Sequence, residues 1–121
     1  MAREVKIPGP DHPITVTPTA DRVVVRAGDR VIADTTKALT LQESTYPAVQ
    51  YIPVGDIDQS VLRRTDTSTY CPFKGDASYY TITGGEDLTD VVWFYEEPYP
   101  AVAEIAGHVA FYPNKVDITV G

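Results

Sequence analysis

The chain of 121 residues has very few of the residues that build common metal and redox sites. It contains one cysteine, Cys71, and two histidines, His12 and His108. One cysteine excludes an internal disulfide, and these three residues are too few for a zinc site built from Cys and His. We therefore expect no metal and no cofactor. A lone cysteine also makes a cytosolic (cytoplasmic) location the default expectation.

Long apolar runs are also missing. No stretch approaches the ~20 apolar residues of a membrane span, and residues 1–13, MAREVKIPGPDHP, contain no apolar segment. We therefore expect no contact with a membrane and no secretory signal. Basic residues are outnumbered, 10 against 17 acidic ones, which gives a net charge of −7. This balance argues against nonspecific binding to nucleic acid, because neutralising phosphates requires Lys and Arg.

Ten prolines, spread from Pro8 to Pro113, argue against long helices, because proline removes a backbone donor and clashes with the preceding turn. Short β-type runs separated by turn residues dominate instead. The expected strands and hairpins are 22–35 with a turn at 27–29, 38–43, 48–54, 77–83, 90–97 after Gly84-Gly85, and 108–121 with a turn at 113–115. Residues 56–64 fit either a turn or a strand. Residues 98–106 predict one short helix, with proline in its first turn and Gly107 after its end.

These elements amount to about nine short strands and one short helix in a single domain. We assign residues 12–121 to this domain. Residues 1–11, punctuated by Pro8-Gly9-Pro10, are expected to be a loose lead-in. The fold class is predicted to be all-β, either an antiparallel two-sheet sandwich or a partly open barrel.

Ten of the twelve aromatic residues lie between Tyr70 and Tyr112. On the strand 90–97, Trp93 and Tyr95 share one face and Phe94 lies on the other. Both faces are apolar, so this strand is expected to be central and Trp93 to be largely buried. Buried Tyr and Trp side chains need a polar partner, and they gather where an apolar wall meets water. That arrangement is typical of a pocket mouth or an interface.

Glu43 continues the strand face that begins with Leu39 and Leu41, which places a carboxylate in line with core residues. A buried carboxylate needs a cation or hydrogen-bond donors. Lys74, in the turn CPFKG, is the expected partner; alternatively, Glu43 lies at the strand end and reaches solvent. The predicted ligand-binding residues are Glu43, Tyr51, Lys74, Tyr80, Trp93 and Tyr95.

Cys71 and Lys74 are three residues apart, and a nearby ammonium lowers the pKa of a thiol. With a second group such as His108 as base, this pattern would suit a nucleophilic enzyme. The alternative, which we favour, is that Cys71 is a small buried apolar residue before Pro72. GDID at 55–58 is expected to be a turn. The sequence contains no phosphate-binding loop, dinucleotide fingerprint or nucleophile elbow.

Five stretches of the chain together resemble one family. They are HPITVTP, VIADTTKALTLQE, QYIPVGDI, TYCPFKGDASYY and WFYEEPYPAVAEIAGHVAFY. In this order they resemble the motifs of the domain of unknown function 427 family over residues 12–120, and C-P-[FY]-K-G-x-A-x-Y is the specific core. The resemblance implies a small, bacterial-type, intracellular, mainly β protein with a single domain. It also implies a β-tent-like fold, in which two antiparallel sheets meet at an angle.

Two properties associated with that resemblance do not carry over to this chain. Several β-tent proteins bind zinc through paired C-x-x-C motifs, which are absent here. The family is also labelled nucleotidyltransferase-like, but neither a phosphate loop nor a catalytic D-x-D context is present. The biochemical role is therefore open.

Three functional hypotheses follow from the residues. The first is a small-molecule-binding domain with an aromatic-lined pocket, anchored by Glu43 and Lys74 and suited to an anionic ligand. The second is an enzyme that uses Cys71 or the Glu43/Lys74 pair as its catalytic residues. The third is a protein-interaction module in which exposed aromatic side chains bind a partner.

Overall fold

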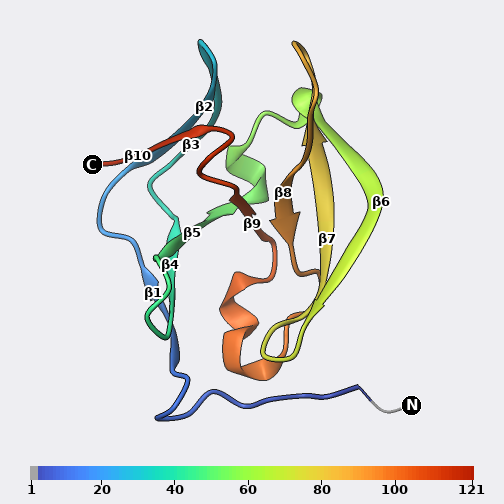
Figure 1. Cartoon of the computed structure of the whole chain (residues 1–121). Helices are drawn as coiled ribbons and strands as arrows, with labels where there is room; N and C mark the ends of the chain where they lie inside the picture. The colour runs from blue at the N-terminus through green and yellow to red at the C-terminus, as the bar shows by residue number, and fades with distance from the viewer. Residues whose placement is uncertain (1–2) are drawn as a thin grey trace.

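The computed structural model describes residues 3–121, which form ten strands in two open antiparallel sheets (Figure 1). In spatial order, the seven-stranded sheet contains β1 (Ile14–Pro18), β4 (Leu39–Glu43), β5 (Val49–Pro53), β9 (His108–Phe111), β8 (Leu88–Phe94), β7 (Gly75–Ile82) and β6 (Leu62–Cys71). The three-stranded sheet contains β10 (Asp117–Val120), β2 (Val23–Ala27) and β3 (Arg30–Thr35). The predicted all-β fold with two antiparallel sheets is confirmed.

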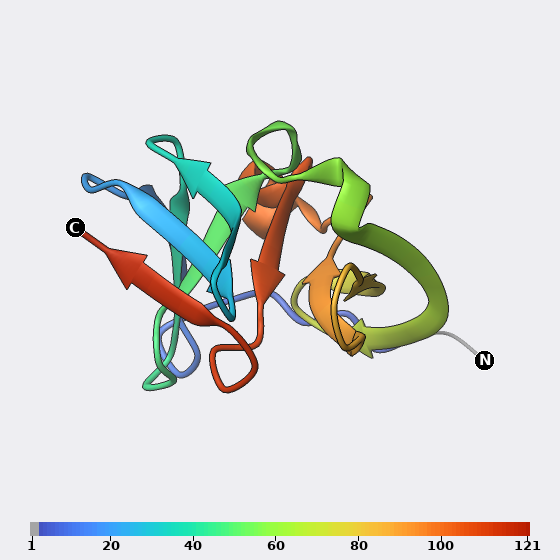
Figure 2. The same cartoon turned by 90° about the horizontal axis from the view of Figure 1, so that it is seen from above.

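The large sheet is buried on both faces by different elements. One face packs against the small sheet, in a core that joins Val25 and Ile32 to Phe111. The other face packs under the helical segment η3 (Pro100–Ile105), which contributes Val102 and Ile105. Strand alternation explains the division, because neighbouring residues of one strand point to opposite faces. Figure 2 shows the small sheet on one side of the molecule and β6 to β8 on the other.

The helical segments are shorter than the sequence suggests. The helix predicted at 98–106 is the 3-10 segment η3, and Val102 inside it has non-helical angles, φ −129° and ψ 28°. Pro98 and Pro100 remove two backbone donors, and Gly107 follows, so a regular helix has no room to propagate. Two further 3-10 turns, η1 (Val54–Asp56) and η2 (Gln59–Val61), occupy part of the undecided stretch 56–64. None of the helical segments in residues 3–121 has the length and apolarity needed to cross a bilayer.

Two strand assignments differ from the sequence prediction. The closing hairpin predicted at 108–121 is wrong, because β9 pairs with β5 and β8 in the large sheet while β10 pairs with β2 in the small sheet. A turn signal shows that the chain reverses and does not show which strand it then joins. Strand β6 was not predicted over its full length, because its sequence LRRTDTSTYC is largely polar and it lies at the sheet edge.

Trp93 lies on the interior strand β8, as predicted, but it is half-buried rather than largely buried. Its ring packs at a tilt against the exposed Tyr112, with the ring centroids 4.6 Å apart. The covering neighbour is therefore itself open to solvent. The indole N–H donates to the Tyr51 hydroxyl over 3.2 Å, which supplies the polar partner that a buried edge requires.

Residues 3–12, which we call the N-terminal arm, run along the end of the molecule beside the β6–β7 turn (Figure 1). The backbone N–H of Lys6 donates to the carbonyl of Pro72 over 2.9 Å. The Tyr70 hydroxyl donates to the carbonyl of Glu4 over 2.6 Å. Met1 and Ala2, the start of the predicted lead-in 1–11, lie outside the described residues.

Candidate functional site

Glu43, Lys74 and His12 form a charged network that we call the clasp. The Lys74 ammonium donates to one carboxylate oxygen of Glu43, and His12 Nε2 lies 2.8 Å from the other. The Glu43 and Lys74 side chains are only 14% and 11% exposed. Glu43 ends the second strand of the large sheet, whereas Lys74 lies in the turn between its last two strands. The clasp therefore joins two distant parts of one bent sheet, and the contact predicted from the sequence is present.

The turn CPFKG aims Lys74 through its backbone. The Lys74 N–H donates to the Cys71 carbonyl over 3.2 Å, and the Lys74 carbonyl accepts from the Tyr99 N–H over 2.9 Å. Gly75 follows with φ 112°, a left-handed conformation that favours glycine. The Phe73 ring stacks on His12 with the ring centroids 4.3 Å apart. The turn thus brings Lys74 to Glu43, and the preceding Phe73 stacks on His12, the other partner of Glu43.

The clasp keeps Glu43 ionised. Burial raises the pKa of Glu43, but hydrogen bonds from Lys74 and His12 outweigh burial and leave that pKa below its ordinary value. Burial raises the pKa values of the neighbouring Tyr51 and Tyr95, so both hydroxyls stay protonated at neutral pH. Among residues 3–121 no buried side-chain oxygen lacks a hydrogen-bond partner.

Most of the predicted binding residues lie on the face covered by η3. Tyr51, Trp93 and Tyr95 pack together there, and the partly exposed Cys71 packs against the same cluster. Tyr80 does not join them, because it follows Tyr79 along β7 and so points to the opposite face. The roles of all these residues in binding stay predictions.

The other candidate chemistry is dispersed. His108, suggested as a base for Cys71, begins β9, and its Nδ1 lies 2.9 Å from the Ala106 carbonyl. The stretch 55–58 is a turn, in which Asp56 accepts from Thr35 and Asp58 accepts from Ser60. In the part of the chain that the structure describes, no three His, Cys, Asp or Glu side chains gather closely enough to hold a metal ion.

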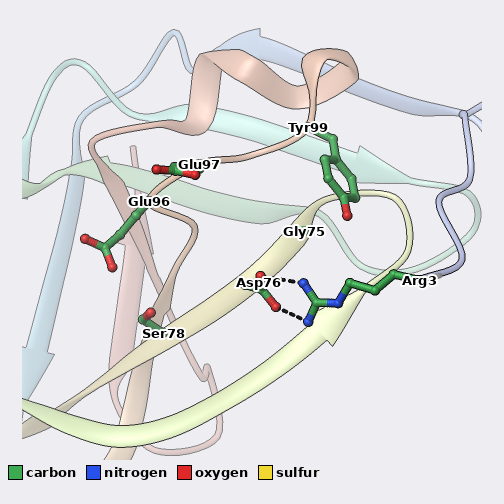
Figure 3. A pocket seen from close by; sticks show the side chains of 7 residues that line it. All are labelled: Arg3, Gly75, Asp76, Ser78, Glu96, Glu97 and Tyr99. Atoms are coloured by element: carbon green, nitrogen blue, oxygen red, sulfur yellow. Dashed lines mark hydrogen bonds and ion pairs between the residues drawn. The ribbon is translucent and has the colours of Figure 1, made fainter. Parts of the chain in front are cut away.

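A cavity of about 390 Å³, which we call the polar cavity, lies between β7 and the segment after β8 (Figure 3). Its lining residues are Arg3, Gly75, Asp76, Ser78, Glu96, Glu97 and Tyr99. Figure 3 shows Arg3 reaching from the N-terminal arm to Asp76 on β7, with Glu96 and Glu97 across the space. The Arg3 guanidinium holds the pKa of Asp76 below its usual value. The cavity thus combines carboxylates, a guanidinium and hydroxyl groups.

A second cavity of about 270 Å³, the aromatic cavity, adjoins the first at Glu96. Its lining residues are Val54, Tyr80, Phe94, Tyr95, Glu96, Gly107, His108 and Val109. Tyr80 stacks on Phe94 with the ring centroids 4.6 Å apart. Because the Ala106 carbonyl can only accept, His108 Nδ1 donates its proton to that carbonyl. The walls are therefore largely apolar, with Glu96 and His108 as the polar side chains beside the tyrosine hydroxyls.

Arg64 on β6 binds residues of both cavities near their junction at Glu96. Its guanidinium donates to Glu96 over 2.5 Å and to Ser78 over 3.3 Å, and it lies over the Phe94 ring at 5.4 Å. This contact lowers the pKa of Glu96. The cavities were missed from the sequence because their residues come from the arm, η1, β7, the β8 end and the start of β9. The alternation of Asp76, Ser78 and Tyr80 along β7 is the one local signal that they share a face.

Comparison with curated proteins found no match for this chain. A protein-family model described as a domain of unknown function, DUF427, matches residues 15–121. The match spans both sheets, the clasp residues Glu43 and Lys74, and every residue of the two cavities except Arg3. The chain therefore belongs to the domain of unknown function 427 family.

Proposed function

We propose that this protein binds a small amphipathic molecule in the two adjoining cavities over β7 and β8. The observation that carries the proposal is the junction at Glu96, where an aromatic cavity meets a polar one. Small-molecule sites in proteins are concave, mostly apolar and fitted with a few convergent polar groups, with volumes of roughly 300–1,000 Å³. The polar cavity, at about 390 Å³, falls in that range, and the aromatic cavity, at about 270 Å³, lies just below it.

The lining chemistry favours a ligand with a ring at one end and a cation or hydrogen-bond donor at the other. Tyr80 and Phe94 offer stacked aromatic rings to an apolar group. Glu96 accepts from Arg64 and keeps further carboxylate lone pairs that can accept from a ligand's donor. The net charge of −7 favours the approach of a cation over that of an anion.

Titration of the isotope-labelled protein with phenethylamine, followed by NMR, tests this function. The ring should shift the resonances of Tyr80, Phe94 and His108, with the ammonium near Glu96. Tyr80→Leu removes the stacked wall and should weaken binding about two- to twelvefold, since aromatic stacking contributes roughly 0.5–1.5 kcal/mol. Tyr112→Leu is the matched control, because Tyr112 contacts Trp93 and lines neither cavity. Equal weakening by both substitutions would contradict the proposed location.

A second candidate function is favoured by the clasp. Nearly buried ion pairs add little to stability compared with apolar residues, and perturbed ionisable groups gather at functional sites. Here Lys74 and Glu43 adjoin Tyr51, Tyr95 and the partly exposed Cys71. An anionic ligand would compete with Glu43 for the Lys74 ammonium, as the sequence suggested.

Variants of the clasp test this second candidate with phenylacetate as the anionic probe. Glu43→Gln removes the competing carboxylate and should strengthen phenylacetate binding, whereas Lys74→Met should abolish it. If neither substitution changes the affinity, the clasp has no role in binding. The interaction-module hypothesis has less support, because Tyr46 and Tyr112 are the only exposed aromatic residues in residues 3–121.

A further inference from the structure

We infer that Asp76 and Tyr99 of the polar cavity, together with the adjoining Tyr70, form a guanidinium-binding subsite, which Arg3 of the chain itself occupies. Arg3 stands where the guanidinium of a ligand longer than phenethylamine would bind, on Asp76 rather than near Glu96. This inference rests on the proposed function and names the cation that its polar half accepts. The ligand class is accordingly a guanidine that also carries an apolar group.

The geometry of Arg3 is that of a recognised ligand. Its Nη1 and Nη2 donate to the two carboxylate oxygens of Asp76 over 2.7 and 2.5 Å, which is the forked arrangement specific to guanidinium (Figure 3). Its Cζ lies 4.1 Å from the centroid of the Tyr70 ring, within range of a cation–π contact. A carboxylate fork and an aromatic face thus act on the same guanidinium.

The aromatic wall is held by groups other than the Arg3 side chain, among them the Glu4 carbonyl, which accepts from the Tyr70 hydroxyl over 2.6 Å. The hydroxyls of Tyr70 and Tyr99 are 2.8 Å apart, and their rings meet edge to face with the centroids 6.3 Å apart. Tyr99 in turn donates its backbone N–H to the Lys74 carbonyl. Hydrogen bonding to Tyr99 raises the pKa of Tyr70 to about 12, so Tyr70 is neutral at physiological pH. The subsite would therefore keep its shape when Arg3 leaves.

Arg3 is placed so that a ligand can displace it. The Arg3 and Asp76 side chains are 54% and 55% exposed, and exposed ion pairs are readily exchanged. A second fork in the chain, Arg22 with Asp34, is also exposed. Arg3, Lys6 and Arg64 are the cations that lie over aromatic rings in residues 3–121, so the Arg22 fork has no aromatic face. It provides an internal comparison of the same ion pair without the subsite.

The position of the subsite sets the length of the ligand. Asp76 and Tyr80 are four residues apart on β7, a separation of about 13 Å at the strand rise of roughly 3.3 Å per residue. A guanidine with a ring at that distance would fill both cavities. The guanidinium could belong to a free small molecule or to the arginine side chain of a peptide.

Binding of two guanidinium probes to the full chain and its variants, measured by calorimetry, tests the inference. 4-Phenylbutylguanidine represents a free small guanidine that carries a ring, and an acetylated Phe-Arg amide represents a peptide. If Arg3 occupies the subsite nine-tenths of the time, Arg3→Ala should strengthen binding of both probes about tenfold, because the apparent affinity scales with the open fraction. A tighter complex with the dipeptide identifies a peptide ligand, and tighter binding of 4-phenylbutylguanidine identifies a small guanidine; either order supports the subsite.

Three controls keep the outcome specific. Asp76→Asn in the Arg3→Ala background should remove the gain, and Arg22→Ala should leave both affinities unchanged. Affinities unchanged by Arg3→Ala, or raised as much by Arg22→Ala, would overturn the inference. Phenethylamine separates the two failures. If phenethylamine still binds beside Tyr80, the subsite alone is wrong; if it does not bind, the proposed function is wrong as well.

Discussion

Replacing Lys74 by Met removes the cation of the clasp while keeping a side chain of similar length. Glu43 then stays in a site where it is 14% exposed, with His12 as its remaining partner. Breaking a buried ion pair on one side costs roughly 3–5 kcal/mol, because an uncompensated charge is left behind. The remaining hydrogen bond to His12 reduces this cost, so we expect Lys74→Met to lower the free energy of unfolding by about 2–3 kcal/mol.

The double variant Glu43→Met/Lys74→Met separates the cost of an unpaired charge from the cost of losing the whole ion pair. It replaces both charges by apolar side chains, a change that is often nearly neutral, so its loss should be about 1 kcal/mol. Because Glu43→Met should also lose more than the double variant, the coupling between the two positions should be at least about 2–3 kcal/mol in a double-mutant cycle. For a domain of this size, Lys74→Met should lower the melting temperature by roughly 6–15 °C.

Urea unfolding followed by circular dichroism measures all four members of the cycle. The expected order of stability is wild type, then the double variant, then each single variant. If Lys74→Met unfolds at the same urea concentration as wild type, the clasp does not hold the sheet. If the double variant loses the sum of the two single losses, Glu43 and Lys74 are not coupled, and the reasoning from burial fails.

Three further predictions concern the same face of the molecule. The folded-state pKa of Glu43 lies below its ordinary value. The ionised Glu43 therefore stabilises the fold above about pH 4.3, and this contribution is lost as pH falls through the folded-state pKa. Glu43→Gln should accordingly flatten the acid branch of a curve of stability against pH. A curve as steep as that of wild type would exclude Glu43 as its source. Gly75→Ala should cost about 1–3 kcal/mol in thermal unfolding, because φ is 112° there, whereas Gly85→Ala, in open space, should be near neutral. Trp93→Ala should cost about 2 kcal/mol, below the range for a fully buried Trp, and partial quenching of Trp93 fluorescence by acrylamide should confirm that it is half-exposed; full quenching would contradict its packing on Tyr51.

The sequence predicts a contact where the chemistry of one side chain demands a particular partner. Glu43 is such a case, because a carboxylate on an apolar strand face requires a cation, and the predicted cation, Lys74, is its partner in the structure. Strand β6 could not be predicted in this way, because an edge strand exposed along most of its length shows no apolar alternation. Tyr80 and Tyr95 pack in the clusters on opposite faces of the sheet, although both line the aromatic cavity.

The two cavities could not be derived from local patterns. Arg3 and Asp76 are 73 residues apart in the sequence, and only the path of the N-terminal arm brings them together. The junction at Glu96 likewise depends on Arg64 reaching across from β6. Pairing between distant segments is set by the whole topology, whereas sequence periodicity reports only the faces of single elements.

The most direct test of the central claim is the position of a bound amphipathic cation, measured by intermolecular NOEs between phenethylamine and the labelled protein. A ligand in the proposed site should show contacts from its ring protons to Tyr80 and Phe94 and from its methylene protons toward Glu96. Contacts to Tyr51 and Trp93 on the opposite face, or an absence of contacts at concentrations that saturate binding, would contradict the account.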